Sequence, residues 1–229
     1  MSMVLHWGSG STPAWRVQLG LAVKGAPYES RLLSFSKGET RTPEFLALNP
    51  RGKVPTLVDG DTVVNESIAI LAYLDRKLPD PPLFGRSLAE AADAWRFVME
   101  FESHGVPAFS TVARPLLFGT WEADGPKVRE GVPALVSELD RLATRVSRGV
   151  MVGDSVSAAD IVWFCGVQQL VRAATRPAAA AFDLDLYPLG GRWPALIPWA
   201  ARIEALPGYA QTMPPHWLES DPPSPRTLA

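Results

Sequence analysis

The stretch Phe45–Ser67, FLALNPRGKVPTLVDGDTVVNES, decides the fold. Its opening apolar run has helical spacing and is stopped by Asn49-Pro50, because proline disfavours helical geometry in the residue before it. Two short apolar segments follow, Pro55–Val58 and Thr62–Val64, on either side of Asp59-Gly60-Asp61. An Asp-Gly turn between such segments is typical of a β-hairpin. The stretch therefore predicts a short helix followed by two antiparallel strands.

Outward from this stretch, strand-like and helix-like segments alternate. Short apolar runs bounded by turn residues indicate strands, and apolar residues at helical spacing indicate helices. The predicted strands are Met3–Trp7 and Tyr28–Leu33, and the predicted helices are Thr12–Lys24, Thr42–Leu48 and Glu66–Leu78. The resulting order βαβαββα predicts a four-stranded mixed sheet covered by helices. Residues 1–83 are therefore expected to form an α/β domain of the thioredoxin-like type.

The second half of the chain has only helical signals. Pro79-Asp80-Pro81-Pro82 is a stiff segment that cannot continue the preceding helix, so a linker is expected at about 79–86. Residues 87–213 are expected to form an all-helical domain, with helices at Ser87–Phe109, Lys127–Arg148, Ser157–Thr175 and Trp193–Leu206 and a last turn from Pro207-Gly208. The proline-rich tail 214–229 is expected to wrap the surface or to be disordered.

Composition excludes several classes of function. The chain has 229 residues with a net charge of −2 and no basic stripe, so no nucleic-acid partner is expected. Its apolar runs are too short to cross a bilayer, and Met1–Trp7 does not resemble a signal peptide, so a cytoplasmic protein without a membrane partner is expected. The lone cysteine, Cys165, forms no internal disulfide, and His6, His104 and His216 match no metal-ligand spacing, so no metal is expected.

The loop Gly8-Ser9-Gly10-Ser11-Thr12-Pro13 leads from the first strand into the first helix. Hydroxyls at a helix start commonly accept hydrogen bonds from backbone N–H groups, so Ser11 or Thr12 can be a cap alone. A hydroxyl here can instead donate a hydrogen bond to a bound thiolate. The positive potential of the helix N-terminus would then lower the thiol pKa. The loop alone does not decide between the two interpretations.

Asn65-Glu66-Ser67 lies where the hairpin enters the next helix. Ser67 or Asn65 can again be a cap. The alternative is an anion site, because backbone N–H groups and a hydroxyl at a helix start suit a carboxylate. Glu66 would then suit an ammonium group. Together they would bind the free amino-acid end of a ligand.

The run from Gly153 to Ile161 has a structural signature. Ser157 and Asp160 have the spacing of a capping box, with Asp in place of the usual Glu. Val156 and Ile161 fit the hydrophobic staple that often accompanies such a box. We therefore expect a determinant of folding here and no catalytic role.

These motifs, in this order, resemble the glutathione transferase superfamily over nearly the whole chain. The run Trp7–Val17, WGSGSTPAWRV, is similar to the serine-type branch, closest to rho-like proteins with similarity to theta and zeta forms. Phe45–Pro55 followed by Asn65-Glu66-Ser67 resembles the family's glutathione-site signature. The resemblance implies an enzyme that joins the glutathione thiolate to hydrophobic electrophiles. It also implies a homodimer.

The resemblance assigns roles residue by residue. Ser11 matches the thiolate-stabilising hydroxyl, with Ser9 and Thr12 as the next candidates. The implied glutathione-binding residues are Val54 through its backbone before a cis Pro55, Glu66 and Ser67 at the γ-glutamyl end, and Lys53 and Lys37 at the glycyl carboxylate. Thr40 departs from the pattern, since many relatives have histidine there, which leaves the glycyl end open.

Two rival mechanisms of the family do not fit these residues. Cys165 lies within a predicted core helix beside Trp163 and Phe164, so it is expected to be buried rather than a nucleophile. A tyrosine-type site lacks its residue, because the first strand ends in His6-Trp7. The expected electrophile pocket draws on residues that also suit a core or a dimer contact: Ser9, Trp15, His104, Phe109, Arg114, Phe118 and Trp121.

Two function hypotheses follow. The first is a glutathione-conjugating enzyme, with peroxidase or isomerase activity as an alternative chemistry at the same site. The second is a non-catalytic relative that uses the fold for binding or assembly. The presence of Ser11, Glu66 and Ser67 favours the enzyme. The non-enzyme hypothesis predicts neither retention on immobilised glutathione nor turnover of an aryl halide.

Overall fold

The computed structural model describes residues 3–180, 186–215 and 217. The chain divides into two compact units. The first comprises the residues up to Phe84 together with the segment that starts at Ala205, and the second comprises Gly85–Glu204. The predicted tail 214–229 lies outside the described residues apart from Pro214, Pro215 and Trp217, as does His216. Each unit is taken by itself below.

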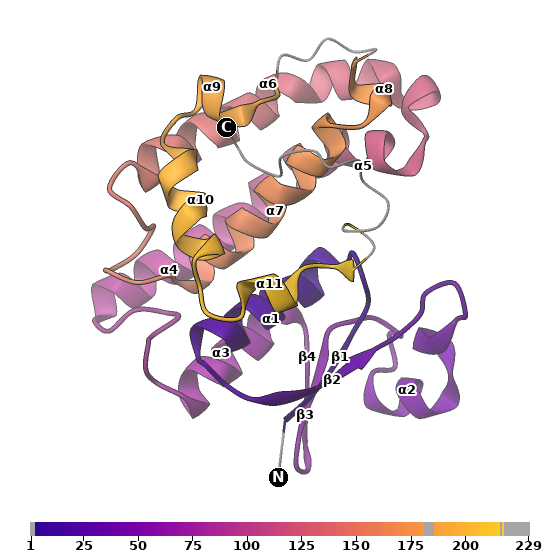
Figure 1. Ribbon diagram of the computed structural model, residues 1–229, viewed down its shortest axis with the longest axis vertical. Helices are drawn as coiled ribbons and strands as arrows, with labels where there is room; N and C mark the ends of the chain where they lie inside the picture. The colour runs from indigo at the N-terminus through magenta and orange to yellow at the C-terminus, as the bar shows by residue number, and fades with distance from the viewer. Residues whose placement is uncertain (1–2, 181–185, 216, 218–229) are drawn as a thin grey trace. The chain divides into compact units, whose positions relative to one another are not determined.

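The first unit contains one four-stranded sheet (Figure 1). Its strands are β1 (Met3–Trp7), β2 (Tyr28–Leu32), β3 (Thr56–Asp59) and β4 (Thr62–Asn65), in the order β2-β1-β3-β4. β1 runs parallel to β2, whereas the β1–β3 and β3–β4 pairs are antiparallel. This is the mixed sheet that the order of sequence elements predicts, so the thioredoxin-like fold is confirmed.

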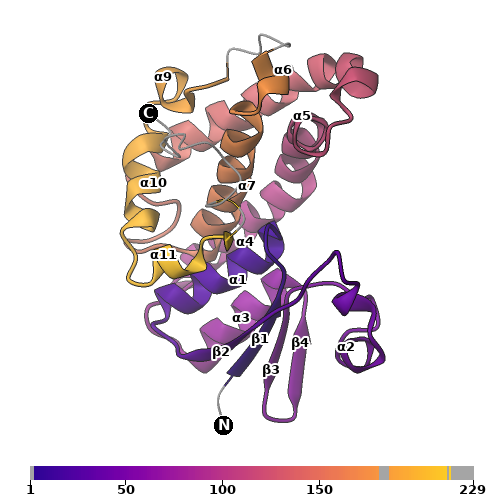
Figure 2. The ribbon, with the colours of Figure 1, turned by 45° about the vertical axis from the view of Figure 1, so that its right-hand side comes forward.

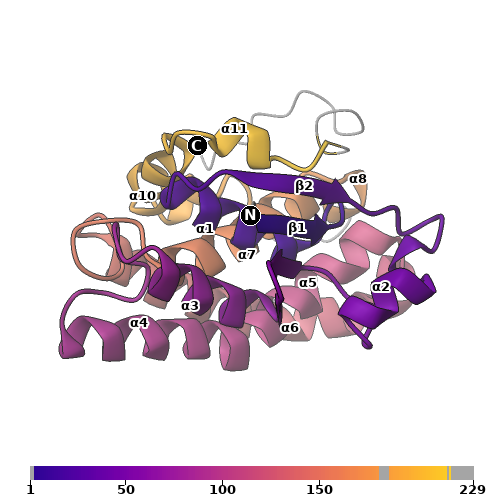
Figure 3. The ribbon, with the colours of Figure 1, turned by 90° about the horizontal axis from the view of Figure 1, so that it is seen from below.

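Helices α1 (Thr12–Val23) and α3 (Ser67–Lys77) pack together against this sheet (Figures 1 and 3). A 3-10 turn (Glu39–Arg41) and α2 (Pro43–Leu48) occupy the connection from β2 to β3. The core between sheet and helices is apolar and includes Leu5, Val17, Leu57, Ile70 and Leu74. Burying such side chains supplies most of the driving force for this arrangement.

The C-terminal segment packs on the first unit. Helix α11 (Tyr209–Thr212) contacts α1, and Nε1 of Trp15 donates a 2.9 Å hydrogen bond to Oγ1 of Thr212. The ring of Trp15 also meets Trp217 edge to face at 5.2 Å. The sequence had placed residues 205–213 in the helical domain, but Trp15 holds them against α1. Periodicity does not reveal this contact between residues almost two hundred positions apart.

The second unit consists of helices (Figures 1 and 2). They are α4 (Leu88–Glu100), α5 (Val106–Phe118), α6 (Trp121–Val146), α7 (Ala158–Ala174), α8 (Pro177–Ala180), α9 (Leu189–Arg192) and α10 (Leu196–Glu204). The predicted helix 87–109 is too short, since α5 continues to Phe118. The predicted start of the next helix at Lys127 is too late, because α6 begins at Trp121. Helices α8 and α9 are absent from the sequence prediction.

A π-helical turn, Phe101–Gly105, joins α4 to α5. The N–H of Val106 donates to the carbonyl of Phe101, five residues earlier. Pro107 has no N–H to offer to Ser103, so the regular ladder is interrupted at this point. The rings of Phe101, Phe109 and Trp163 pack edge to face around the turn. The aromatic cluster holds the two helices in one continuous run.

The predicted capping box at the start of α7 is confirmed. Ser157 Oγ accepts from the N–H of Asp160, and the Asp160 carboxylate accepts from the N–H of Ser157. The same carboxylate also accepts from Met151 N and from Trp199 Nε1, each at 2.9 Å. Burial raises the pKa of Asp160, and these hydrogen bonds act in the opposite direction. Asp160 therefore ties α7, α10 and the preceding loop together.

Candidate functional site

Three segments of the first unit meet at one end of the sheet. His6, near the end of β1, pairs with Thr56 at the start of β3, and Thr56 pairs with Asn65 at the end of β4. Consequently the loop after β1, the peptide before β3 and the start of α3 leave the sheet at the same end. Figure 2 shows this end above the strands, opposite the β3–β4 hairpin. The predicted glutathione-site residues Ser11, Val54, Glu66 and Ser67 all lie on these segments.

Ser11 is the N-cap of α1. Its Oγ accepts a 3.3 Å hydrogen bond from the N–H of Ala14, and its carbonyl accepts from the N–H of Trp15. Thr12, the other proposed cap, is instead the first helical residue. The cap uses the oxygen of the Ser11 side chain as acceptor only. Its O–H donates to no other residue in the described part of the chain, so the proton is available to a ligand.

The start of α3 is open and strained. Its N-cap is Glu66, which has φ 67° and makes no capping hydrogen bond through its side chain. Such a backbone costs a residue other than glycine about 1–3 kcal/mol and is concentrated at functional sites. Ser67 and Asn65 do not act as caps here: Asn65 accepts from Thr56 Oγ1 at 2.8 Å instead. The first N–H groups of α3 are therefore left for a ligand or for water.

A buried arginine lies beside Ser67. Arg16, on α1, is 5% exposed, and its Nη1 lies 3.5 Å from Oγ of Ser67, which is 6% exposed. This contact joins the first helix, which Ser11 caps, to the start of α3. It also places a positive charge next to the candidate anion site. Arg16 is a charged residue within the apolar run of α1, but nothing in the local sequence pattern indicates its contact with Ser67.

Asn49 holds the loop before β3 in place. This buried side chain donates from Nδ2 to the carbonyl of Lys53 at 2.7 Å and accepts at Oδ1 from the N–H of Arg51. The loop then reaches the Val54–Pro55 bond, which is cis as predicted. Val54 is half-buried, two residues before β3 begins. The sequence predicts only that Asn49 ends the helix. Its contacts with Arg51 and Lys53 lie beyond that helix, so a helix-stop signal does not reveal them.

The two residues predicted to bind the glycyl carboxylate of glutathione are exposed lysines. Lys53 directly precedes Val54, and Lys37 lies in the loop that follows β2. Thr40, where many relatives have histidine, is buried in the 3-10 turn. Its carbonyl would lie 2.7 Å from a Cβ added at Gly52, whose φ is 59°. Glycine is thus required at position 52 for the loop that carries Lys53 to pass Thr40.

The first loop also has an aromatic neighbour. A Cβ at Gly8 would lie 2.3 Å from the ring of Phe35, so only glycine allows this approach. The Phe35 side chain is 54% exposed next to the loop that carries Ser9 and Ser11. Burial, followed by the charge of Arg31, lowers the pKa of His6 on β1.

Residues proposed for rival mechanisms lie elsewhere. Tyr28 pairs with Met3, at the opposite end of β1 from Ser11. Nε1 of Trp7 is bonded to Ser30 Oγ at 2.7 Å. Cys165 is fully buried in α7, as predicted. Among the residues that the structure describes, no group of three or more His, Cys, Asp or Glu side chains is arranged to hold a metal ion.

The proposed electrophile-pocket residues have different environments. Trp15 and Phe109 are almost completely buried, so both contribute to the cores of their units rather than to an open pocket. Ser9 and Trp121 are half-buried, and His104 is exposed within the π-helical turn. Ser9 and Trp15 belong to the first unit and the others to the second.

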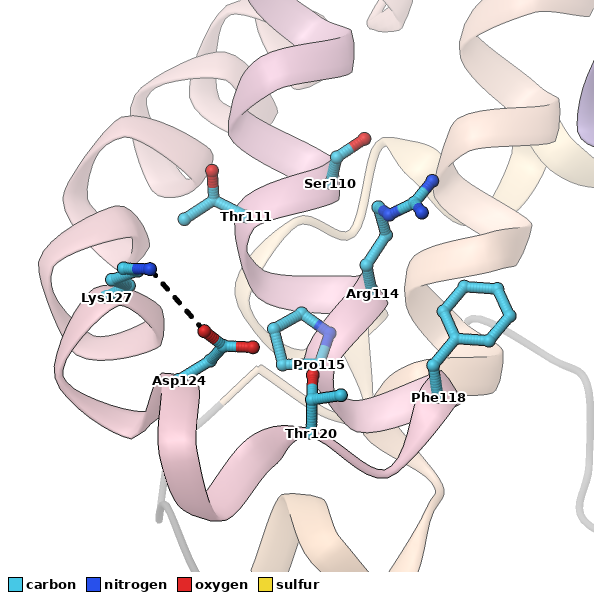
Figure 4. A pocket seen from close by; sticks show the side chains of 8 residues that line it. All are labelled: Ser110, Thr111, Arg114, Pro115, Phe118, Thr120, Asp124 and Lys127. Atoms are coloured by element: carbon cyan, nitrogen blue, oxygen red, sulfur yellow. Dashed lines mark ion pairs between the residues drawn. The ribbon is translucent and has the colours of Figure 1, made fainter.

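Arg114 and Phe118 line one cavity of about 360 Å³ between α5 and the start of α6 (Figure 4). The guanidinium of Arg114 lies 5.3 Å from the centre of the Phe118 ring. On the α6 side of the cavity, Lys127 and Asp124 form a 3.6 Å ion pair. The cavity therefore combines the exposed ring of Phe118 with the guanidinium of Arg114, which forms no ion pair with any residue that the structure describes. No helix in the described part of the chain is long and apolar enough to span a bilayer.

Comparisons with known proteins agree with this geometry. A family profile described as "Glutathione S-transferase, N-terminal domain" matches residues 10–77. "Glutathione S-transferase A" of Pleuronectes platessa is 32% identical, and the alignment covers 95% of this chain and 94% of the relative. A "probable maleylacetoacetate isomerase" of Vibrio cholerae is 31% identical, with 93% and 96% covered.

A solved structure shows the same fold over nearly its whole length. The crystal structure of a glutathione S-transferase from the Antarctic clam Laternula elliptica has a TM-score of 0.79 at 30% identity, with 97% of each chain covered. Fold, motif order and sequence identity over full-length relatives lead to one conclusion. The chain belongs to the glutathione S-transferase family.

Proposed function

We propose that this protein is a glutathione transferase of the serine type, similar to rho-like members, and that Ser11 donates a hydrogen bond to the glutathione thiolate. One observation carries the proposal: Ser11 caps α1 through its oxygen while its O–H remains uncommitted among the described residues. The cap fixes the position of the hydroxyl at the positive end of α1. Capping and thiolate binding are therefore compatible at this one side chain.

The rest of the glutathione molecule would bind along the same end of the sheet. The open N-terminus of α3 and the Ser67 hydroxyl suit the γ-glutamyl carboxylate, and exposed Glu66 suits its ammonium group. The backbone of Val54 before cis Pro55 suits the cysteinyl unit. Lys53, with Lys37 as the second candidate, would attract the glycyl carboxylate. Arg16 adds positive charge behind Ser67.

The chemistry follows from these groups. Glutathione supplies a thiol, whose proton leaves to solvent, and the thiolate then forms a carbon–sulfur bond to an electrophile while a leaving group departs with its electron pair. The N-terminus of α1 and the Ser11 O–H stabilise the anionic sulfur, which lowers the thiol pKa from about 8.5. Orientation at a fixed site contributes further to rate. No covalent bond to the protein is required.

A pair of Ser11 variants tests this mechanism. Ser11→Ala removes both the cap and the O–H, whereas Ser11→Asp keeps a capping oxygen and places a negative charge near the sulfur. We expect both to lose at least about tenfold in conjugation of an aryl halide, the size of effect expected from a hydrogen bond to a charged group. Only Ser11→Ala should lose about 1 kcal/mol of stability. Full activity of Ser11→Ala would transfer the role to Ser9 or Thr12.

Isomerase chemistry at the same site is a second candidate. It is favoured by the 31% identity to the probable maleylacetoacetate isomerase over almost the whole chain. Glutathione-dependent turnover of maleylacetoacetate, compared with turnover of an aryl halide under the same conditions, separates the two activities. Glutathione peroxidase activity is checked in the same series with an organic hydroperoxide. Failure to bind immobilised glutathione would instead support the binding or assembly hypothesis.

A homodimer is part of the proposal. Leu88, Ala92, Trp95 and Met99 recur at spacings of three and four residues on α4, and all four side chains are exposed. An exposed apolar stripe on a helix is a common contact surface between subunits. We expect Trp95→Glu to shift the protein from dimer to monomer in sedimentation equilibrium. A monomeric wild-type protein would contradict the homodimer.

A further inference from the structure

A second cavity lies within the helical unit, away from the cavity beside Phe118. It has a volume of about 710 Å³ and is lined by Asp93 and Phe97 of α4, by the last turns of α6 and by the loop 147–153. Cavities of this size accommodate small molecules. Three arginines line it: Arg141 and Arg145 on α6, and Arg148 directly after the helix. No role proposed above uses this cavity.

Arg145 is the central group. It is half-buried, and its guanidinium lies 3.5 Å from the centre of the Phe97 ring. A guanidinium carries five N–H donors, yet Arg145 forms neither a hydrogen bond nor an ion pair with any residue that the structure describes. Burial, and then the nearby Arg96, lowers the pKa of Arg145. An anionic ligand would relieve both effects.

The nearest carboxylates are committed elsewhere. Asp93 and Glu100 form ion pairs with Arg96, at 2.6 and 3.2 Å. Arg141 has only a loose, exposed contact with Glu138 at 3.9 Å, and Arg148 makes no hydrogen bond or ion pair within the described residues. The lining therefore carries three guanidinium charges against the single carboxylate of Asp93. The side chains that line the cavity therefore carry a net charge of more than +1.

The hydroxyl groups of the lining do not offer donors. Thr144 Oγ1 donates to the carbonyl of Asp140, and Ser147 Oγ donates to the carbonyl of Thr144. The side-chain donors left for a ligand are thus the guanidiniums. Their planar forks match the oxygens of phosphate or carboxylate groups in pairs. A phosphate monoester carries close to two negative charges on one group at neutral pH, which matches the excess here better than one carboxylate does.

We propose that this cavity binds the phosphate group of a small phosphorylated molecule, with Arg145 and Arg148 as its main ligands. The apolar part of the lining, Phe97, Val150 and Met151, would contact the remainder of that molecule. The proposal concerns the helical unit alone and does not rest on transferase activity. The ordinary alternative is that these arginines only stabilise the negative C-terminal end of α6.

Isothermal titration calorimetry of the full chain with inorganic pyrophosphate tests the proposal. S-methylglutathione is present at saturation so that the proposed glutathione site does not contribute, and ionic strength is held constant. We expect saturable binding at one site per chain. Arg145→Lys keeps the charge but loses the fork, and Arg148→Gln removes an exposed charge. Each should weaken binding about tenfold.

Arg129→Gln is the matched control, because it removes an exposed arginine charge from the same helix outside the cavity. It should change the affinity less than about twofold. The proposal is overturned if the wild type shows no saturable binding, or if Arg129→Gln weakens binding as much as Arg148→Gln. Arg148 is exposed and bonded to no described residue, so its variant tests the site even if the Arg145 variant folds poorly.

A carboxylate ligand distinguishes the two possible chemistries. Succinate at the same ionic strength should bind at least about tenfold more weakly than pyrophosphate, because each of its groups carries one charge. Equal affinity for the two compounds would overturn the assignment to phosphate. Variants that lose stability without any change in pyrophosphate affinity would support the purely structural role at the end of α6.

Discussion

Nη1 of Arg16 lies 3.5 Å from Oγ of Ser67, and both side chains are buried in the first unit. The contact links two helix N-termini that lie far apart in the sequence. Ser11 caps one of them, and strained Glu66 begins the other. Arg16 therefore connects the helix start proposed to bind the thiolate with the helix start proposed to bind the γ-glutamyl carboxylate.

Ser67→Ala should separate binding from chemistry. The variant loses one hydroxyl that has two roles: it is proposed to bind the γ-glutamyl carboxylate, and it contacts Arg16. A hydrogen bond to a charged group contributes roughly 1.5–3 kcal/mol, so KM for glutathione should rise about tenfold or more, with kcat much less affected. Initial-rate kinetics at saturating electrophile measure both constants. Ser137→Ala, at an exposed serine on α6, is the control, and a fall in kcat at unchanged KM would contradict the assignment.

Asp75→Asn should destabilise the first unit severely. The Lys24 side chain is 0% exposed, and its Nζ bonds Asp75 Oδ1 at 2.8 Å. Asp75 also accepts from the N–H groups of Leu83 and Phe84. Removing one partner of a buried pair leaves an uncompensated charge and costs about 3–5 kcal/mol. Urea unfolding measures the loss, and the double variant Lys24→Met/Asp75→Asn should recover part of it. No recovery would mean that the backbone contacts matter more than the charge.

Acid sensitivity should depend on Asp59. Hydrogen bonds from Lys77 and then Tyr73 lower the pKa of Asp59 in the folded state. The unfolded chain, with an ordinary pKa near ~3.9, therefore takes up the proton first as pH falls. The contribution of Asp59 is complete above the unfolded pKa and is lost as pH falls through the folded pKa. Asp59→Asn should flatten the loss of stability below about pH 4.

The control for this pH dependence is Asp61→Asn on the same hairpin. Asp61 is exposed and forms no ion pair with a residue in the described ranges. Its variant should retain the acid-dependent slope of the wild type in unfolding curves recorded across the same pH range. Equal slopes for wild type and Asp59→Asn would show that other carboxylates, such as Glu90, dominate acid unfolding.

Thr212→Val should loosen the C-terminal segment. The variant removes the acceptor of the hydrogen bond from Trp15 Nε1 while nearly preserving volume. Loss of a partner for a buried donor costs about 1–3 kcal/mol. Denaturant unfolding followed by tryptophan fluorescence measures the change. Thr111→Val, an exposed threonine on α5, should stay within about 0.5 kcal/mol, and an equal effect of both variants would contradict a specific role for Thr212.

Local signals were sufficient for most of the first unit. The Asp-Gly turn, the prolines and the alternation of apolar residues predicted all four strands to within one residue at each end. The capping box of α7 was also readable, because its partners lie three residues apart. The C-terminal part of α5 and the first turns of α6 were not, since Pro115 and Pro126 argue against helix. Packing between α5 and α6 outweighs that local cost.

The site was predictable only where its residues act locally. Ser11 was readable as a cap or as a donor because both roles follow from a helix start. The positive φ of Glu66 and the position of Arg16 depend on how β4, α1 and α3 come together, which no periodicity encodes. Asn49 was likewise seen as a stop signal, whereas its side chain spans the loop to Lys53.

The return of the C-terminal segment to α1 has a consequence for how the protein can be made and modified. The first unit lacks one of its covering elements until the ribosome has synthesised Thr212 and Trp217. Folding of this unit during translation is therefore finished only after the whole helical unit has emerged. For the same reason, a chimera that exchanges the N-terminal domain between relatives should include residues 205–217, because a cut at Phe84 alone separates Trp15 from Thr212 and Trp217.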